Sequence, residues 1–213
     1  MPLPSTGPRA VQREATRLRI LAAAVDLLVE SGYAATSTLA VQSRAAVSRG
    51  ALLHHFPTRG ALFGALAEHL VASNEQAVVR VLGELSLLAR DRSVRRALQV
   101  LFEVQRRCEF QAELELWAAA RTDGELRQVL RSVEGRARPA LHRLVAEVFG
   151  PRAAAASGFP VAAELSVTLM RGLVVALPLR DGTAGSEALL DQWADLLERL
   201  LPLQREAPPI RPT

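Results

Sequence analysis

Lysine is absent from this chain of 213 residues, so apart from four histidines every basic side chain is an arginine. Cysteine occurs once, as Cys108, which excludes an internal disulfide and fits a reducing compartment such as the cytoplasm. No run of ~18 uncharged apolar residues is present, and we therefore expect no membrane-spanning segment. Hydrophobic residues make up 49% and charged residues 23%, a composition typical of a globular protein.

Common patterns of catalytic sites are also missing. The chain has neither a glycine-rich phosphate loop nor a G-x-S-x-G nucleophile motif. Its histidines, His54, His55, His69 and His142, have no carboxylate or cysteine at the spacing of a metal site. We therefore expect no enzymatic activity, no metal ion and no cofactor.

The formal charge is unevenly distributed along the chain. Residues 1–66 hold seven arginines against three acidic residues, whereas the remaining residues hold nineteen of each. The whole formal excess of +4 therefore lies in the first third of the chain, where it would neutralise nucleic-acid phosphates. Considered alone, a chance fluctuation of a few charges is the alternative explanation.

Residues 36–56 have the pattern of two short helices joined by a tight turn. Serine and threonine stand where each helix would begin, and their hydroxyls can cap the first free N–H groups. Apolar residues recur at helical spacing on one side of each helix, Val41 with Ala45 and Leu52 with Phe56. The outward positions of the second helix combine a small residue with positive and hydrogen-bonding groups, which suits a DNA major groove. They are Arg49, Gly50, Leu53 and His54.

A longer set of residues stands in the same register as this pattern. It comprises Gly32-Tyr33, Thr36-Ser37, Val41, Ala45, Val47-Ser48, Gly50, Leu52 and His55-Phe56-Pro57, with Arg19-Ile20-Leu21 and Ala23-Ala24 upstream. Together these residues resemble the DNA-binding signature of TetR-type transcriptional regulators. Three positions depart from that signature: Gln42 where a small alanine is common, Ala46 where the turn usually has glycine, and Leu53 where a tyrosine often binds phosphate.

The resemblance implies an all-α fold with an N-terminal three-helix helix-turn-helix domain and a C-terminal helical domain for ligand binding and dimerisation. We expect an arm over residues 1–10, the DNA-binding domain over 11–66, the second domain over 67–203 and a disordered tail over 204–213. Double-stranded DNA is the implied partner. The expected contacts come from Thr36, Ser37, Arg44, Ser48, Arg49, Gly50, Leu53, His54, His55 and Arg59.

Apolar periodicity predicts further helices over residues 12–31, 58–88, 94–108, 109–120, 122–149, 161–177 and 186–201. Gly32 should end the first of them, and Thr58 should cap the second. The sequence Thr122-Asp-Gly-Glu125 has the spacing of a capping box that would begin the long helix over 122–149. Pro139 lies inside that helix and should kink it.

The last two predicted helices are apolar on more than one face, which favours a homodimer interface within residues 161–201 that includes Leu173 and Trp193. The resemblance also implies a small hydrophobic effector bound among the middle helices, although these side chains could simply fill the core. The candidate lining residues are Phe102, Gln105, Phe110, Glu113, Leu114, Trp117, Val133, Arg136 and Met170.

These expectations converge on a homodimeric transcriptional repressor that leaves a palindromic operator when a small apolar effector binds. An effector-independent architectural DNA-binding protein is one alternative, and equal affinity for unrelated sequences would favour it. A helical enzyme or binding protein with a vestigial helix-turn-helix is another, and failure to bind any DNA at low salt would favour that.

Overall fold

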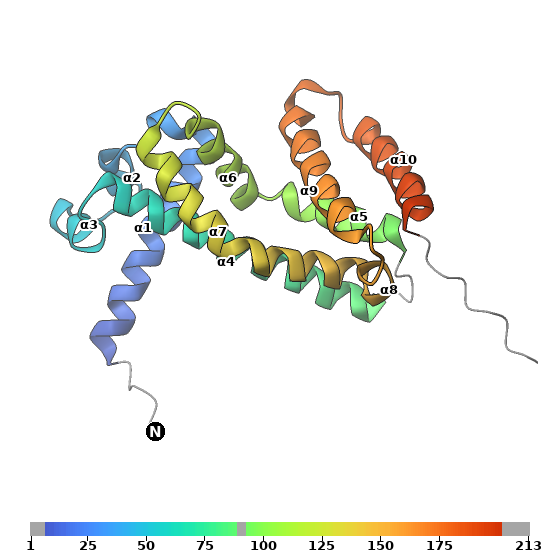
Figure 1. The fold of residues 1–213 in the computed structure, drawn as a ribbon. Coiled ribbons are helices and arrows are strands. Elements are labelled where there is room, and N and C mark those ends of the chain that lie inside the picture. Colours follow the sequence, from blue (N-terminus) through green and yellow to red (C-terminus); the bar gives the residue numbers. More distant parts are fainter. Residues whose placement is uncertain (1–6, 89–92, 202–213) are drawn as a thin grey trace, which may run out of the picture. The chain divides into compact units, whose positions relative to one another are not determined.

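The computed structural model describes residues 7–88 and 93–201, and within them it has helices and no strand. The expected all-α fold is therefore confirmed for this part of the chain. The tail expected over residues 204–213, and most of the arm expected over 1–10, lie outside the described residues. In chain order the elements (Figure 1) are α1 (Pro8–Ala35), α2 (Thr38–Arg44), α3 (Arg49–His55), α4 (Arg59–Leu88), α5 (Val94–Gln105), α6 (Cys108–Ala119), α7 (Gly124–Phe149), α8 (Pro151–Ala154), α9 (Phe159–Ala176), the short 3-10 helix η1 (Leu177–Leu179) and α10 (Ala184–Leu200).

Two compact units make up the chain, and neither is continuous in sequence. The first consists of Met1–Gln76 with Arg106–Arg138, and the second of Ala77–Gln105 with Pro139–Thr213. The first unit therefore contains α6 and the first half of α7 in addition to the helices expected within 11–66. It includes α6 because that helix packs along α1.

The core of the first unit is built on α1, whose buried residues recur at helical spacing from Ile20 to Leu28. Val41 of α2 and Leu52 of α3 pack into this core, together with Phe56 directly after α3. Full burial of one large apolar side chain stabilises a fold by ~1.5–3 kcal/mol. The other large members come from α4, α6 and α7: Leu62, Phe63, Leu66, Leu70, Leu116, Leu126 and Leu130.

Both ends of α1 have identifiable causes. The helix begins at Pro8, where a residue without an N–H fits the first turn, so the expected arm over residues 1–10 is wrong for Pro8–Ala10. Near the other end, three residues before Ala35, the backbone leaves helical geometry at Gly32, with φ 75° and ψ 175°. This positive φ favours glycine, and the break matches the expected end of the helix.

In the second unit, α5 packs against both α9 and α10. Met170 and Leu173 lie on the inner side of α9 and are buried within the chain itself. The expectation that Leu173 lies in a subunit interface is therefore wrong, because its side chain is already 96% covered. Trp193 of α10 is half-buried, and its Nε1 donates a hydrogen bond to Ser166 Oγ at 2.9 Å.

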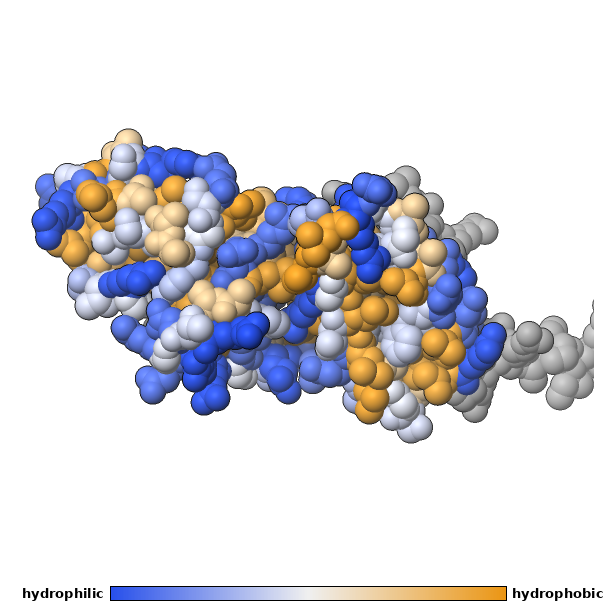
Figure 2. All heavy atoms as spheres, turned by 90° about the horizontal axis from the view of Figure 1, so that it is seen from above, coloured by the Kyte–Doolittle hydropathy of each residue, from blue (hydrophilic) through white to orange (hydrophobic). Residues whose placement is uncertain are grey.

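Apolar side chains also remain on the surface of this unit (Figure 2). They are separated by four, seven or ten residues, which places them on one side of each helix, away from the buried residues of α9 and α10. We call them the outer apolar rows: Val161, Leu165 and Val175 on α9, and Leu189, Leu196 and Leu200 on α10, each at least 40% exposed.

The segment Phe159–Leu179 is long and apolar enough to cross a membrane by length and composition alone, although no run of ~18 uncharged residues occurs in it. It contains two charged residues, Glu164 and Arg171. Its inner side packs against α5. A core helix of a globular protein can have the same length and composition. In α9 the large apolar residues that are exposed are those of its outer row.

Candidate nucleic-acid interface

Serine and threonine side chains begin the three helices of this site. Ser37 Oγ accepts a hydrogen bond from the backbone N–H of Ala40 at 3.1 Å, and Ser48 Oγ accepts one from Ala51 at 3.1 Å. Thr58 Oγ1 does the same for α4 at 3.0 Å. Each cap satisfies an N–H group without an intrahelical partner and stabilises its helix by ~1 kcal/mol. The predicted helix starts are thus confirmed, and Ser37 and Ser48 lie exposed at the beginnings of α2 and α3.

The turn between α2 and α3 depends on Ala46. Its φ is 51°, and it is the only non-glycine residue with a positive φ in the described chain. The conformation is held by hydrogen bonds from the N–H groups of Ala46 and Val47 to the carbonyls of Ser43 and Gln42, both at 3.2 Å. A residue with a β-carbon is strained here, so the usual glycine of the signature has a physical reason.

α3 has one buried side and one exposed side. Leu52 is 2% exposed, and the following Phe56 is equally buried, so both attach the helix to the core. Arg49, Gly50 and His54 are exposed, and Leu53 is 43% exposed, as predicted. A β-carbon added at Gly50 would meet no atom within 4 Å, so nothing in the fold requires glycine there.

Additional basic groups gather beside α3, and Arg17 was missed by sequence reasoning. His55 is half-buried, and its pKa is lowered by burial and then by the positive charges of His54, Arg13 and Arg17. The Arg17 guanidinium lies 5.9 Å from the centroid of the Phe56 ring. Arg13 and Arg17 are one helical turn apart on α1, and this spacing was the available signal.

Two of the expected contact residues are engaged within the fold. Thr36 is fully buried, and its hydroxyl donates to the carbonyl of Gly32 at 2.8 Å. It therefore fixes the connection between α1 and α2, and the expectation that it contacts DNA is not met in this structure. Arg44 is exposed but donates two hydrogen bonds to the Glu30 carboxylate, at 3.0 and 2.6 Å, which lower the pKa of Glu30.

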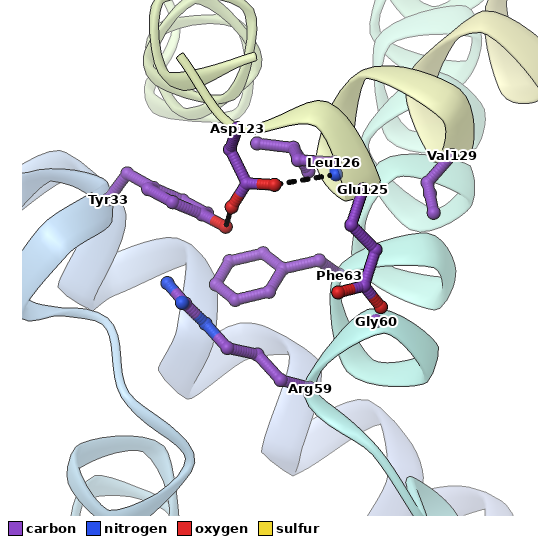
Figure 3. Close-up of a pocket in the computed structure, with 8 residues that line it drawn as sticks. All are labelled: Tyr33, Arg59, Gly60, Phe63, Asp123, Glu125, Leu126 and Val129. Atoms are coloured by element: carbon purple, nitrogen blue, oxygen red, sulfur yellow. Dashed lines mark hydrogen bonds between the residues drawn. The ribbon is translucent and has the colours of Figure 1, made fainter.

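Arg59 stands at the start of α4 beside a small cavity (Figure 3). Its guanidinium lies over the rings of Tyr33 and Phe63, 4.6 and 5.2 Å from their centroids. The cavity of about 30 Å³ is lined by these three residues and by Gly60, Asp123, Glu125, Leu126 and Val129. That volume suits about one water molecule and is too small for an organic effector.

The first residues of α7 meet Tyr33 at this cavity. Tyr33 Oη donates to Asp123 Oδ2 at 2.7 Å, while Asp123 Oδ1 accepts from the N–H of Leu126 at 3.0 Å. Asp123 therefore caps α7, and the predicted capping role of Thr122 is wrong because its hydroxyl donates backwards to the Ala119 carbonyl. Burial, followed by the hydrogen bond to Asp123, raises the pKa of Tyr33 to about 12. The N–H of Leu126 and the Tyr33 hydroxyl lower the pKa of Asp123.

Most of the predicted effector-lining residues belong to the first unit. Phe110 and Val133 are buried, and Leu114 is half-buried. The polar members have protein partners. Glu113 Oε2 accepts from Asn74 Nδ2 at 2.6 Å, Trp117 Nε1 donates to Glu134 at 3.0 Å, and the exposed Arg136 donates to Glu68 at 2.6 Å.

The other predicted lining residues, Phe102, Gln105 and Met170, are buried in the second unit. Gln105 Oε1 has no hydrogen-bond partner among the described residues, which marks it as a buried polar atom open to a ligand donor. Cys108 is exposed as a residue and its thiol donates to Glu109 at 3.2 Å, while partial burial of the thiol group and this carboxylate raise its pKa. The thiol therefore stays protonated and weakly reactive.

Comparison with known proteins places this interface in a family. Residues 20–66 match the family model of the bacterial regulatory proteins of the tetR family. The HTH-type transcriptional regulator Rv2912c of Mycobacterium tuberculosis is 30% identical over 165 residues, which cover 77% of this chain and 83% of that protein. The HTH-type transcriptional regulator CymR of Pseudomonas putida is 35% identical over 62% of this chain and 64% of its own length.

Solved structures share the fold. The multidrug binding protein EbrR, crystallised with imidazole, superimposes with a TM-score of 0.60 at 23% identity, covering 89% of this chain and 97% of EbrR. A TetR-family member from Streptomyces coelicolor A3 gives a TM-score of 0.59 at 23% identity, with 88% and 98% of the two chains covered. At these identities the likeness extends to the fold alone.

Proposed function

Because the chain belongs to the TetR family of bacterial regulatory proteins, we propose that it is a homodimeric repressor of transcription acting in the cytoplasm. Each subunit inserts α3 into the major groove of a palindromic operator. A small apolar effector then releases the dimer from the DNA. The observation that carries this proposal is the exposed side of α3, where Arg49, Gly50 and His54 are accessible to a partner.

Base reading is assigned to the exposed side of α3. Arg49 stands at the first position of the helix and can donate two hydrogen bonds to a guanine edge. His54 lies near the other end, and Leu53 can contact a thymine methyl group. Glycine costs a helix ~1 kcal/mol relative to alanine, so the absence of any internal need for Gly50 favours close approach of DNA as its reason.

Phosphate neutralisation is assigned to the basic groups around α3. Arg13 and Arg17 of α1 supply charge next to His55, and Arg59 supplies it at the start of α4. Arg44 can exchange its exposed carboxylate partner, Glu30, for a phosphate, since an exposed ion pair contributes only ~0–1 kcal/mol. Ser37, Ser48 and His55 then contact the backbone at the ends of α2 and α3.

Dimerisation is assigned to the outer apolar rows of α9 and α10, within the predicted range 161–201. Covering such a surface with a second apolar surface stabilises the complex by ~25 cal/mol per Å² of apolar area removed from water. Two-fold symmetry would place two α3 helices about one turn of DNA apart, ~34–36 Å, which requires a palindromic site.

Effector binding is assigned to the predicted second domain, residues 67–203. The resemblance to TetR-type regulators, whose larger domain holds an apolar effector pocket, is the basis of this proposal. Within the second unit, the buried Phe102 and Met170 supply apolar side chains, and Gln105 Oε1 is a buried acceptor without a partner among the described residues. Release of DNA requires the ligand to favour the non-binding state, and a differential affinity of a few kcal/mol is enough.

Selection of bound duplexes from a random pool, followed by affinity measurements on the selected site, tests this function. Arg49→Ala and His54→Ala should each weaken specific binding by ~1–3 kcal/mol while leaving the melting temperature unchanged. Arg131→Ala removes the same charge as Arg49→Ala from an exposed position of α7 and should have little effect.

Two outcomes would contradict the proposal. Equal affinity for the selected and for unrelated duplexes would favour an effector-independent architectural protein. No binding to any duplex at low salt would favour a vestigial helix-turn-helix. Effector release is tested separately by a screen of small hydrophobic compounds for those that lower operator affinity, with Trp117 fluorescence read in a Trp193→Phe background.

A further inference from the structure

The guanidinium of Arg59 has a fixed place although the side chain is exposed. It lies 4.6 Å from the centroid of the Tyr33 ring and 5.2 Å from that of Phe63 (Figure 3). A cation over the face of an aromatic ring is attracted by the ring quadrupole. An arginine on the surface is otherwise among the side chains with the most rotamer freedom, so this contact restricts it before any partner arrives.

The aromatic platform under Arg59 is itself held at two points. The Tyr33 ring packs against the Phe63 ring, with centroids 4.8 Å apart and an interplanar angle of 51°. Its hydroxyl donates to Asp123 Oδ2 at 2.7 Å. Asp123 cannot easily turn away, because its other carboxylate oxygen caps α7 through the N–H of Leu126.

We propose that Tyr33 and Asp123 are positioning residues that hold the Arg59 guanidinium ready to bind a backbone phosphate of DNA. The proposal rests on the DNA-binding function proposed above and adds two residues to it, one of them the cap of α7. Tyr33 supplies the ring on which the guanidinium lies, and Asp123 fixes the orientation of that ring. Neither residue touches the DNA.

The expected gain is entropic. Ordering a long side chain at an interface costs an amount that corresponds to about a 2- to 10-fold loss of affinity, and ordering it beforehand avoids that loss. Phosphate contacts also have a separate signature, because each one adds about 0.9 to the slope of log affinity against log salt. Affinity and salt slope therefore distinguish a residue that makes the contact from one that positions it.

The experiment measures binding of a mixed-sequence duplex at several salt concentrations. Arg59→Ala should weaken binding and reduce the salt slope by about 0.9. Tyr33→Leu, which removes the ring, should weaken binding about 2- to 10-fold in the wild-type background and have no effect in the Arg59→Ala background. Arg131→Ala is the matched control for charge, and its slope should equal that of the wild type.

Tyr33→Phe is a second variant in case Tyr33→Leu does not fold. It keeps the ring and the net charge but removes the hydrogen bond to Asp123, so a smaller loss of affinity is expected, again only when Arg59 is present. An unchanged salt slope in Arg59→Ala would overturn the proposal. So would a cost of either Tyr33 variant that persists in the Arg59→Ala background, since that would indicate a purely structural role.

Arg49→Ala separates this proposal from the function on which it rests. If Arg49→Ala weakens specific binding while Arg59→Ala leaves both affinity and slope unchanged, the positioning role fails and the regulator remains. If the wild-type protein binds no duplex at low salt, both fail together.

Discussion

The exposed side of α3 and the outer apolar rows of α9 and α10 are opposite in chemistry. On α3, the exposed Arg49 carries a positive charge, Gly50 has no side chain, and His54 has a hydrogen-bonding ring. The rows on α9 and α10 offer valine and leucine alone. A polar, positive surface gains most from an anionic partner with hydrogen-bonding groups, whereas an apolar surface gains from being removed from water. The two surfaces therefore suit two different partners, which we propose to be DNA and a second copy of the chain.

The largest effect is expected at the outer apolar rows. Leu165→Arg and Leu196→Arg introduce a charge that dimerisation would bury without a partner, at a cost of several kcal/mol. Each side chain is about half exposed in the single chain, at 49% and 48%, so the subunit itself should still fold. Sedimentation equilibrium should show the dissociation constant raised at least ~100-fold.

Leu173→Ala is the matched control for those variants. This leucine lies on the same helix as Leu165 but is 4% exposed, so its truncation should lower the free energy of unfolding by ~2–5 kcal/mol. The mass of the folded species should stay that of the dimer. A dimer that resists both arginine variants would place the subunit contact outside the outer apolar rows.

A second test separates stability from DNA binding on α3. Gly50→Ala adds a β-carbon that meets no atom of the protein within 4 Å, and it removes the helix penalty of glycine. The free energy of unfolding should therefore rise by ~0.5–1 kcal/mol, while operator affinity falls because the added methyl group enters the space between helix and DNA. Thermal melting measures the change in stability, and a gel-shift titration measures the change in operator affinity. A rise in both would mean that DNA does not approach this position closely.

The turn before α3 allows the reverse substitution, of an alanine by a glycine. Ala46 has a φ of 51°, and Ala46→Gly should raise the free energy of unfolding by ~1 kcal/mol by relieving this strain. Operator affinity should remain that of the wild type, because the substitution leaves the exposed side of α3 unaltered. Chemical denaturation measures the first quantity. A lowered midpoint at unchanged slope would contradict the strain inferred here.

The smallest effect is spectroscopic and confined to the first unit. Tyr33 is the only tyrosine of the chain, so all phenolate absorbance reports this one site. In the folded protein its pKa is raised from 10.0 to about 12, so the stability it contributes is complete below pH 10.0 and is lost as the pH rises toward 12. Asp123→Asn keeps a cap for α7 but removes the charged acceptor, and should shift the phenolate titration to lower pH. An unchanged titration would assign the raised pKa to burial alone.

Local features of this fold follow directly from the sequence. The caps at Ser37, Ser48 and Thr58 were predicted because each involves a hydroxyl and an N–H three residues later. The break at Gly32 was likewise predicted, whereas the positive φ at Ala46 was implied only by the glycine that is usual there in the TetR-type signature. All of these interactions are decided within one turn of the chain, which a sequence displays in full.

The errors concern choices between nearby candidates and contacts between distant residues. Thr122 and Asp123 can both cap α7, and the tie to Tyr33, ninety residues away, favours Asp123. Leu173 belongs to an apolar helix with two apolar sides, and periodicity does not tell which side faces its own chain. The position of Arg59 over an aromatic platform requires α1 and α4 to meet, and no local pattern predicts that.

The double use of the Asp123 carboxylate has a consequence for hydrogen exchange. One oxygen closes the first turn of α7 and the other receives the Tyr33 hydroxyl, so the turn loses its cap when the side chain rotates away from Tyr33. Opening of the turn and release of the tyrosine are then a single event with one free energy. Protection of the Leu126 amide proton against exchange with solvent would then measure that free energy, and with it the fraction of time for which the end of α1 and the start of α7 are separated.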